Sequence, residues 1–108
     1  PAVRAGDFIF VSGVPAGPRA GEQNEEAAFA RAFATLTRVL EAAGADWTQV
    51  VEITTYHTDL PGQFAAFSAV KDRHLSAPYP AWTAVDVDRL LPDGAIVEIS
   101  LTVYAPRN

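Results

Sequence analysis

The chain has 108 residues, 49% of them hydrophobic, and no cysteine, so it fits a single domain over residues 1–108 and excludes disulfides and thiolate chemistry. Its net charge of −5 and its eight scattered Lys and Arg residues argue against a nucleic-acid partner or an anionic membrane surface, because both bind to basic patches. No apolar run approaches the roughly 20 residues of a membrane span and no signal peptide is recognisable, so we expect a cytoplasmic protein without a membrane partner.

The first half of the chain predicts a strand, a loop and a long helix. Residues 8–14 are β-branched and aromatic, and residues 15–22 are rich in Gly and Pro. Asn24 can cap the helix that follows, and Gly44 supplies a left-handed stop. The apolar positions that repeat at helical spacing between them are Phe29, Ala32, Phe33, Leu36, Val39, Leu40 and Ala43.

The second half predicts a strand, a shorter helix and two more strands. Residues 50–58 form the next strand, and a helix with apolar Phe64, Phe67, Val70 and Leu75 must end before Pro78. Residues 80–85 and 97–99 are again β-branched and aromatic. The turn sequence Leu91-Pro92-Asp93-Gly94 lies between these two segments, so we expect them to pair as a β-hairpin.

The order of elements predicts an α+β fold with the sequence βαβαββ. Helical crossovers join parallel strands and short loops join antiparallel ones, so the sheet should be mixed, with both helices on one face. We expect the other face to be apolar. A small domain with such a face is stabilised when a second copy covers it.

Several separate motifs along the chain resemble those of the YjgF/Rid family in order and spacing. They are Gly6-Asp7-Phe8-Ile9-Phe10-Val11-Ser12-Gly13, Leu40-Glu41-Ala42-Ala43-Gly44-Ala45, Val51-Glu52-Ile53-Thr54-Thr55-Tyr56 with Asp59, Pro80-Ala81-Trp82-Thr83-Ala84-Val85, and Val97-Glu98-Ile99. The resemblance covers nearly the whole chain. It implies a chorismate-mutase-like fold and a homotrimer, in which three sheets face inward as a barrel and three small-molecule clefts lie between subunits. The best-known family members hydrolyse reactive 2-imino or enamino acids to keto acids and ammonia.

Glu98 is the candidate catalytic residue and Ser12 a candidate ligand-binding residue. Glu98 stands among apolar residues, where a carboxylate is costly to bury without a partner or a function. Its position matches the family glutamate that positions or activates the hydrolytic water, so it either acts as a general base or holds neighbouring backbone or a trimer contact. Ser12 matches a serine that lines the family cleft. Its alternative role is a strand-end hydroxyl bonded to its own backbone.

Trp82 occupies the place where the active family group has the arginine that binds the substrate carboxylate. Indole has one N–H donor and no charge, whereas a guanidinium offers a planar fork of charge-assisted donors. Trp82 therefore either remodels the cleft for an uncharged or aromatic ligand or plugs it by packing. Thr83 and Ala84 follow in the same motif as expected substrate-binding residues, and Arg4 is a cation that could reach the cleft mouth.

Further departures from the family pattern weaken the case for the usual reaction. Ser68 and Lys71 stand where the family has an asparagine and an aromatic residue. His57 and His74, the only histidines, have no metal-ligand spacing with Asp or Glu, and no glycine motif binds phosphate, so we expect no metal and no cofactor. His57 is expected to pack with a hydrogen bond, and His74 to face solvent or the C-terminus of the second helix.

These observations predict a Rid-like protein that binds or hydrolyses an imine, an enamine or a related uncharged or aromatic metabolite. The usual 2-imino acid deaminase activity should be weak or absent. Two alternatives remain open: a trimeric binding or scaffold protein without catalysis, and a tautomerase that uses Pro1 as a general base.

Overall fold

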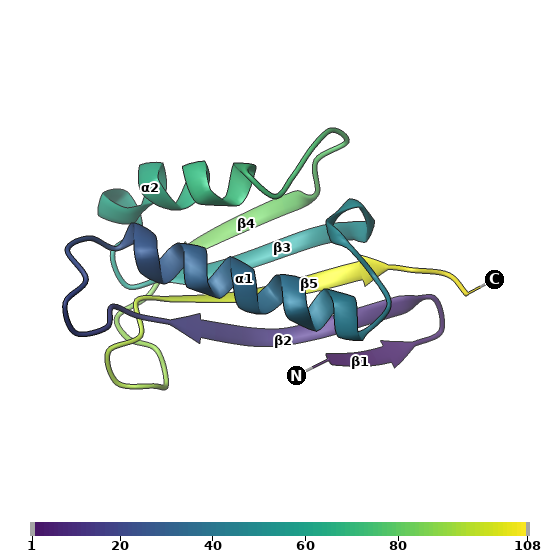
Figure 1. Cartoon of the computed structure of the whole chain (residues 1–108), viewed down its shortest axis with the longest axis horizontal. Coiled ribbons are helices and arrows are strands. Elements are labelled where there is room, and N and C mark those ends of the chain that lie inside the picture. Colours follow the sequence, from purple (N-terminus) through teal and green to yellow (C-terminus); the bar gives the residue numbers. More distant parts are fainter. Residues whose placement is uncertain (1, 108) are drawn as a thin grey trace.

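Residues 2–107 are described by the computed structural model, in which two helices cover one face of a five-stranded sheet (Figure 1). The α+β fold and the placement of both helices on one face are as predicted. A short 3₁₀ turn, Trp47–Gln49, links the first helix to the third strand. The elements in chain order are β1 (Ala2–Ala5), β2 (Phe8–Ala16), α1 (Glu26–Ala42), β3 (Val50–His57), α2 (Leu60–Asp72), β4 (Ala81–Asp86) and β5 (Val97–Tyr104).

The sheet is mixed, as expected, with the strand order β1-β2-β5-β3-β4. Of the described strands, only β3 and β4 pair in parallel, whereas β5 pairs antiparallel with β2 and with β3. The predicted hairpin of β4 and β5 is therefore wrong, because β3 lies between them. The segment 87–96 is long enough to carry the chain across β3. In addition, β5 buries alternate side chains along most of its length, so it suits the centre of the sheet better than an edge.

A strand that the sequence analysis did not predict, β1, forms one edge of the sheet. It pairs antiparallel with β2 after a tight turn in which Gly6 has a φ of 61°. Three of its four residues are exposed, so it lacks the alternation that identifies a strand with one buried face.

The core lies between the sheet and the helices. Phe29, Phe33, Leu36 and Leu40 of α1 are fully or almost fully buried, as their spacing predicts. Gly44, with a φ of 78°, follows the end of α1 as expected. The predicted cap at Asn24 is wrong, since the N-cap residue is Glu25, whose side chain makes no capping hydrogen bond.

The open face of the sheet, the face without helices, is only partly apolar. Phe8, Phe10 and Tyr104 gather at the β1 end, where the Phe8 ring centroid lies 6.2 Å from that of Phe10 and 5.3 Å from that of Tyr104. They are 40%, 45% and 45% exposed. The centre of this face instead carries hydroxyl and carboxyl groups, and Tyr56 and Val85 add apolar surface beyond them. The open face is therefore apolar toward its ends, whereas it was expected to be apolar throughout.

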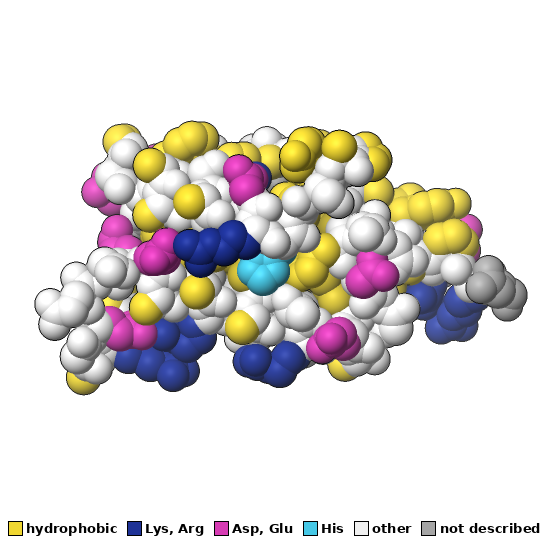
Figure 2. All heavy atoms as spheres, turned by 45° about the horizontal axis from the view of Figure 1, so that its top comes forward, with side chains coloured by type: hydrophobic (Ala, Val, Ile, Leu, Met, Phe, Trp, Pro, Cys, Tyr) yellow, Lys and Arg dark blue, Asp and Glu magenta, His cyan; other side chains and the backbone are white. Residues whose placement is uncertain are grey.

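Surface charge on the view in Figure 2 is interspersed: the Lys and Arg side chains form small separate groups among Asp and Glu. Within residues 2–107, no helix is long and apolar enough to cross a membrane.

Candidate functional site

Glu98 lies on the open face in the middle of the sheet. Its chain neighbours Val97 and Ile99 are completely buried against the helices, and the pleat directs Glu98 to the opposite side, where it is half-buried. Its partners in register are Tyr56 of β3 and Pro15 of β2. We had expected the apolar sequence neighbours to surround the carboxylate. They do not, because they point to the other face of the sheet.

A bulge in β2 brings the Ser12-Gly13 motif to Glu98. The register of β2 against β5 shifts between Val11 and Val14, which places Ser12 and Gly13 in the irregular segment. A Cβ atom at Gly13 would lie 2.5 Å from Cδ and from Oε2 of Glu98. Glycine at this position therefore provides the space that the glutamate side chain occupies.

Hydroxyl groups continue the site across the sheet. Thr54 of β3 is in register with Ser100 of β5 and with Thr83 of β4, and the bulge that contains Ser12 lies opposite Ser100. Residues in register share a face, so these four hydroxyl-bearing residues form a row next to Glu98. We call Ser12, Thr54, Thr83, Glu98 and Ser100 the open-face cluster.

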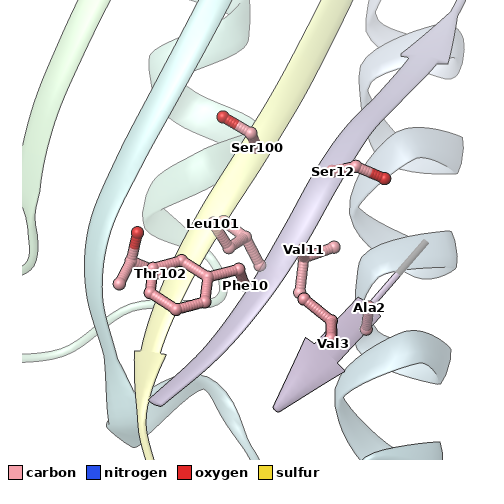
Figure 3. Close-up of a pocket in the computed structure, with 8 residues that line it drawn as sticks. All are labelled: Ala2, Val3, Phe10, Val11, Ser12, Ser100, Leu101 and Thr102. Atoms are coloured by element: carbon pink, nitrogen blue, oxygen red, sulfur yellow. The ribbon is translucent and has the colours of Figure 1, made fainter. Parts of the chain in front are cut away.

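A hollow of about 480 Å³ adjoins this cluster on the side of β1 (Figure 3). β1, β2 and β5 supply its walls, with Ser12 and Ser100 at one end and Val3, Phe10 and Thr102 at the other. Its volume falls within the range of about 300–1,000 Å³ that is typical of small-molecule pockets. The hollow offers an apolar wall beside polar groups.

The charges on this face are acidic. Glu52, whose Oε1 atom accepts a hydrogen bond from Thr102 at 3.1 Å, joins Glu98 there. Of the Lys and Arg residues that the structure describes, only Arg4 lies in a strand. It is in register with buried Ile9, and its guanidinium donates hydrogen bonds to the carbonyls of Ala105 at 2.8 Å and Gly6 at 3.2 Å. The structure therefore does not bring Arg4 to Glu98 within the chain.

Trp82 lies on the helix face of the sheet. Its indole ring stacks on Phe64 of α2 with a centroid separation of 5.3 Å and lies 6.0 Å from Phe67. Its N–H donates to Oγ1 of Thr55 at 2.9 Å. Trp82 and Glu98 were expected to face one cleft from adjacent strands. Within one chain they lie on opposite faces, because Trp82 is in register with buried Ile53 of β3, whereas Glu98 is in register with Tyr56, three residues further along the same strand.

The other two residues of the Trp82 motif that were expected to bind substrate, Thr83 and Ala84, lie on different faces of the sheet. Thr83 shares the open face with Glu98, whereas Ala84 is in register with the buried residue Thr55 and shares the helix face with Trp82. Strand geometry alone requires this alternation.

A buried hydrogen-bond chain extends from Trp82 to α2. Thr55 Oγ1 lies 2.8 Å from Nε2 of His57, and Nδ1 of His57 lies 3.1 Å from Oε1 of Gln63. The amide oxygen of Gln63 can only accept, so Nδ1 carries the proton and Nε2 accepts from the Thr55 hydroxyl. Burial lowers the pKa of His57, against the opposing effects of the hydrogen bond with Gln63 and the charge of Asp86. The expected packing role of His57 is confirmed.

His74 packs more closely than expected. Its ring stacks on Phe33 with a centroid distance of 5.1 Å and lies 5.5 Å from Trp47. Burial lowers its pKa, and the neighbouring charge of Arg73 adds to the effect. Among the described residues, no group of three or more His, Asp or Glu side chains could hold a metal ion.

Sequence reasoning missed Thr54 and Ser100 as neighbours of Glu98, and Thr55 and Gln63 as partners of His57. One signal was present: polar residues alternate with apolar ones through β5, which places Glu98 and Ser100 on one face. The strand order was needed to add Thr54 and Thr83, since nothing in the local pattern identifies the neighbouring strand.

Comparison with known proteins identifies one family. The model of the family described as "Endoribonuclease L-PSP" matches residues 1–105. The RutC family protein YjgH of Escherichia coli is 39% identical over 80% of this chain and 68% of its own length. The RutC family protein PYRAB12510 of Pyrococcus abyssi is 34% identical over 95% of this chain and 83% of its own. The crystal structure of RidA from the Antarctic bacterium Psychrobacter sp. PAMC 21119 superimposes with a TM-score of 0.83 and 34% identity, covering 95% of this chain and 85% of that one.

Proposed function

Because the chain belongs to the YjgF/Rid family, which includes the RutC and RidA proteins and which the endoribonuclease L-PSP model describes, we propose that it is a homotrimer with small-molecule clefts between subunits. Each cleft contains the open-face cluster and binds or hydrolyses an imine, an enamine or a related uncharged or aromatic metabolite. The usual deamination of 2-imino acids is weak or absent.

The acidic character of the open face is the observation that carries this substrate class. Glu52 and Glu98 contribute carboxylates, while the guanidinium of Arg4 is bound to backbone carbonyls elsewhere. A substrate carboxylate would meet repulsion here, whereas a neutral imine would not be repelled and its protonated iminium form would be attracted to Glu98.

Exposed aromatic residues support the trimer. Phe8, Phe10 and Tyr104 leave a cluster of rings uncovered at one end of the open face. A monomer of this size gains stability when such a patch is buried in an interface. Packing by this face would also shelter the hollow beside Phe10 from water.

In the hydrolysis we propose, Glu98 accepts a proton from a water molecule as the water oxygen attacks the imine carbon. Glu98 returns this proton to the imine nitrogen, which gives a carbinolamine. The proton of the carbinolamine hydroxyl then passes through Glu98 to the nitrogen as the C–N bond breaks, so the carbonyl forms and ammonia or an amine leaves. The hydroxyl row next to Glu98 supplies donors and acceptors that orient the water and the substrate nitrogen.

The packing of Trp82 favours a second candidate, a trimeric binding or scaffold protein without catalysis. Its N–H is bonded to Thr55 and its ring stacks on Phe64, so the residue that replaces the family arginine is held by its own chain. In this case Glu98 would serve only to hold the Gly13 segment or a subunit contact. The third hypothesis, a Pro1-dependent tautomerase, concerns a residue outside those that the structure describes.

Two cyclic imines test the proposed substrate preference: 1-pyrroline, which has no carboxylate, and 1-pyrroline-2-carboxylate, which has one. We expect 1-pyrroline to raise the melting temperature more than its carboxylated counterpart, because the acidic face repels the carboxylate. A ligand at 100 times its dissociation constant adds about 2.7 kcal/mol of stability, which a melting curve can detect. The variant E98Q should lose this shift, and the control E41Q, which removes an exposed carboxylate on α1, should keep it.

A deaminase assay provides the complementary test. Ammonia release from 2-iminobutyrate or 2-aminoacrylate, generated in the cuvette by a dehydratase, should be no faster than the uncatalysed background. Clear acceleration of either substrate, or a preference for the carboxylated imine, would contradict the proposal. If neither imine shifts the melting temperature and E98Q dissociates the oligomer, the scaffold candidate is correct instead.

A further inference from the structure

The buried hydrogen-bond chain that begins at Trp82 continues beyond α2 to the residue before β5. Five hydrogen bonds of 2.8 to 3.4 Å join its members, which are in order Trp82, Thr55, His57, Gln63, Thr58 and the carbonyl of Ile96. Thr55, His57 and Gln63 are completely or almost completely buried. A buried polar group requires a partner, so each member of the hydrogen-bond chain depends on its neighbours.

The two ends of the hydrogen-bond chain determine the direction of every bond in it. The indole of Trp82 has one N–H group and can only donate, and the backbone carbonyl of Ile96 can only accept. Each group between them therefore accepts a bond from the Trp82 side and donates one toward Ile96. For His57 this requires a neutral ring, with the proton on Nδ1 and the lone pair of Nε2 directed at the Thr55 hydroxyl.

This arrangement decides what Trp82 offers to a ligand. The indole lines a hollow of about 370 Å³ between α2 and β4, which we call the α2–β4 hollow. Its only polar atom, Nε1, donates its hydrogen to completely buried Thr55. The surface that Trp82 gives to the hollow therefore consists of carbon atoms. Such a wall selects rings and apolar edges by packing, and it does not recognise a hydrogen-bond acceptor.

His57 is the one member of the hydrogen-bond chain that can change its charge. Its ring lies edge-on to Phe67 of α2 with a centroid distance of 4.7 Å, and Val97 of β5 is in register with it. Asp86, at the end of β4, is the charged group that acts on it. A proton on Nε2 reverses the bond with Thr55, because the ring then donates and the hydroxyl loses its acceptor. The change thus reaches the oxygen atom to which Trp82 donates.

We propose that Thr55, His57 and Gln63 are positioning residues for Trp82, which hold its N–H away from the α2–β4 hollow and transmit the charge of His57 to the indole. The role of this hollow as part of a ligand cleft rests on the proposed function, whereas the hydrogen-bond chain does not. When a link is lost, the N–H of Trp82 is free to turn toward the hollow and to donate to a ligand. These buried residues thus set specificity without contact with the ligand.

The first test compares the two tryptophans by NMR with the ¹⁵N-labelled full chain. The indole N–H groups of Trp82 and Trp47 each donate to a threonine hydroxyl at 2.9 Å, from Thr55 and Thr37 respectively, so Trp47 is an internal control. T55V should shift the Trp82 indole signal and make its N–H exchange with solvent at least about fivefold faster, a factor that corresponds to one hydrogen bond. T55S keeps the hydroxyl and should restore both values, and Trp47 should be unchanged in both variants.

A pH titration of the same spectra tests the transmission of charge. The Trp82 indole signal of the wild type should titrate with a midpoint below 6.5, because burial lowers the pKa of His57, and H57Q should lose this titration. His74 provides the matched control, since its ring lies 5.5 Å from that of Trp47 and burial lowers its pKa too. H74Q should therefore remove the titration of the Trp47 signal and leave that of Trp82.

Both measurements are made without a ligand, so their outcome is separate from that of the imine tests. Equal exchange rates of the Trp82 N–H in T55V and T55S would overturn the proposal. So would a Trp82 titration that is absent from the wild type or persists in H57Q. If T55V does not fold, the titration decides.

Discussion

At Gly13 the absence of a side chain has a specific purpose, because the carboxylate of Glu98 occupies the space where a Cβ atom would stand. At Gly17 a Cβ atom would also collide with a neighbour, but here the neighbour is a backbone group, the carbonyl of Gly94. A side chain can rotate away from such a collision, whereas a backbone group cannot do so without moving the loop.

We therefore predict that G13A displaces Glu98 with a modest loss of stability, within about 1–3 kcal/mol, and that G17A is more destabilising. G13A should also abolish the thermal shift by 1-pyrroline, as E98Q does. Urea denaturation and the ligand shift measure the two effects separately. Equal ligand shifts in G13A and in the wild type would show that the position of Glu98 does not matter.

His57 makes the stability of the protein depend on pH. Its pKa lies below the ordinary value of 6.5 in the folded protein, because burial disfavours the charged ring. The unfolded chain thus binds a proton at a higher pH than the folded chain. The free energy of unfolding should be greatest above about pH 6.5 and should fall as the pH decreases through 6.5 toward the folded pKa.

The variant H57Q, which can hydrogen-bond without titrating, should flatten this dependence between about pH 7.5 and about pH 5.5. His74 contributes with the same sign, since its pKa is also lowered, so H74Q should flatten the curve in part and the double variant most. Denaturation curves at three pH values are sufficient. A slope unchanged in H57Q would contradict the buried neutral state.

Some site residues could be predicted from sequence and others could not, for physical reasons. Glu98 and Ser12 stand in recognisable motifs, and both are found in the open-face cluster. Trp82 was expected to face the same cleft because of its position in the family motif and because a hairpin would have paired its strand with that of Glu98. The face to which a side chain points depends on pairing with neighbouring strands, which the local sequence does not encode.

At the scale of elements, Phe67 is the residue that packs α2 most closely against the rest of the core. Phe67 is completely buried, and its ring centroid lies 5.3 Å from that of Phe29, 5.6 Å from that of Phe33 and 4.7 Å from that of His57. Phe64, one turn earlier, is 47% exposed, and its ring stacks on that of Trp82. The two phenylalanines thus have the same chemistry and different surroundings.

F67A should lower the free energy of unfolding by about 3–5 kcal/mol, because it leaves a cavity in the core. F64A should cost markedly less, since water already reaches that ring. Chemical denaturation of both variants measures the difference. Comparable losses would mean that Trp82 and Phe64 form a stabilising unit as important as the core.

The helices and the central strands followed from their apolar periodicity, whereas the sheet order did not. Phe29, Phe33, Leu36 and Leu40 are buried as their spacing predicts. The β4–β5 hairpin was inferred from a turn sequence, but residues 87–96 instead carry the chain across β3. Short loops favour neighbouring strands without requiring them, so long-range pairing decides the order.

For the whole molecule, the central claim is that the open face forms an interface between subunits and that the clefts of the trimer contain the open-face cluster. The exposed rings of Phe8, Phe10 and Tyr104 mark the surface that would be covered. A charge introduced among them should prevent association, because burying an unpaired carboxylate is costly. Phe10 at 45% exposure and Phe64 at 47% form a matched pair on opposite faces.

Light scattering of the purified chain at micromolar concentration tests this claim most directly. We predict a particle of three chains of 11.5 kDa each for the wild type and for F64D, and dissociation in F10D. A stable monomer in the wild type would contradict the account, since it would remove the intersubunit clefts on which the proposed function rests.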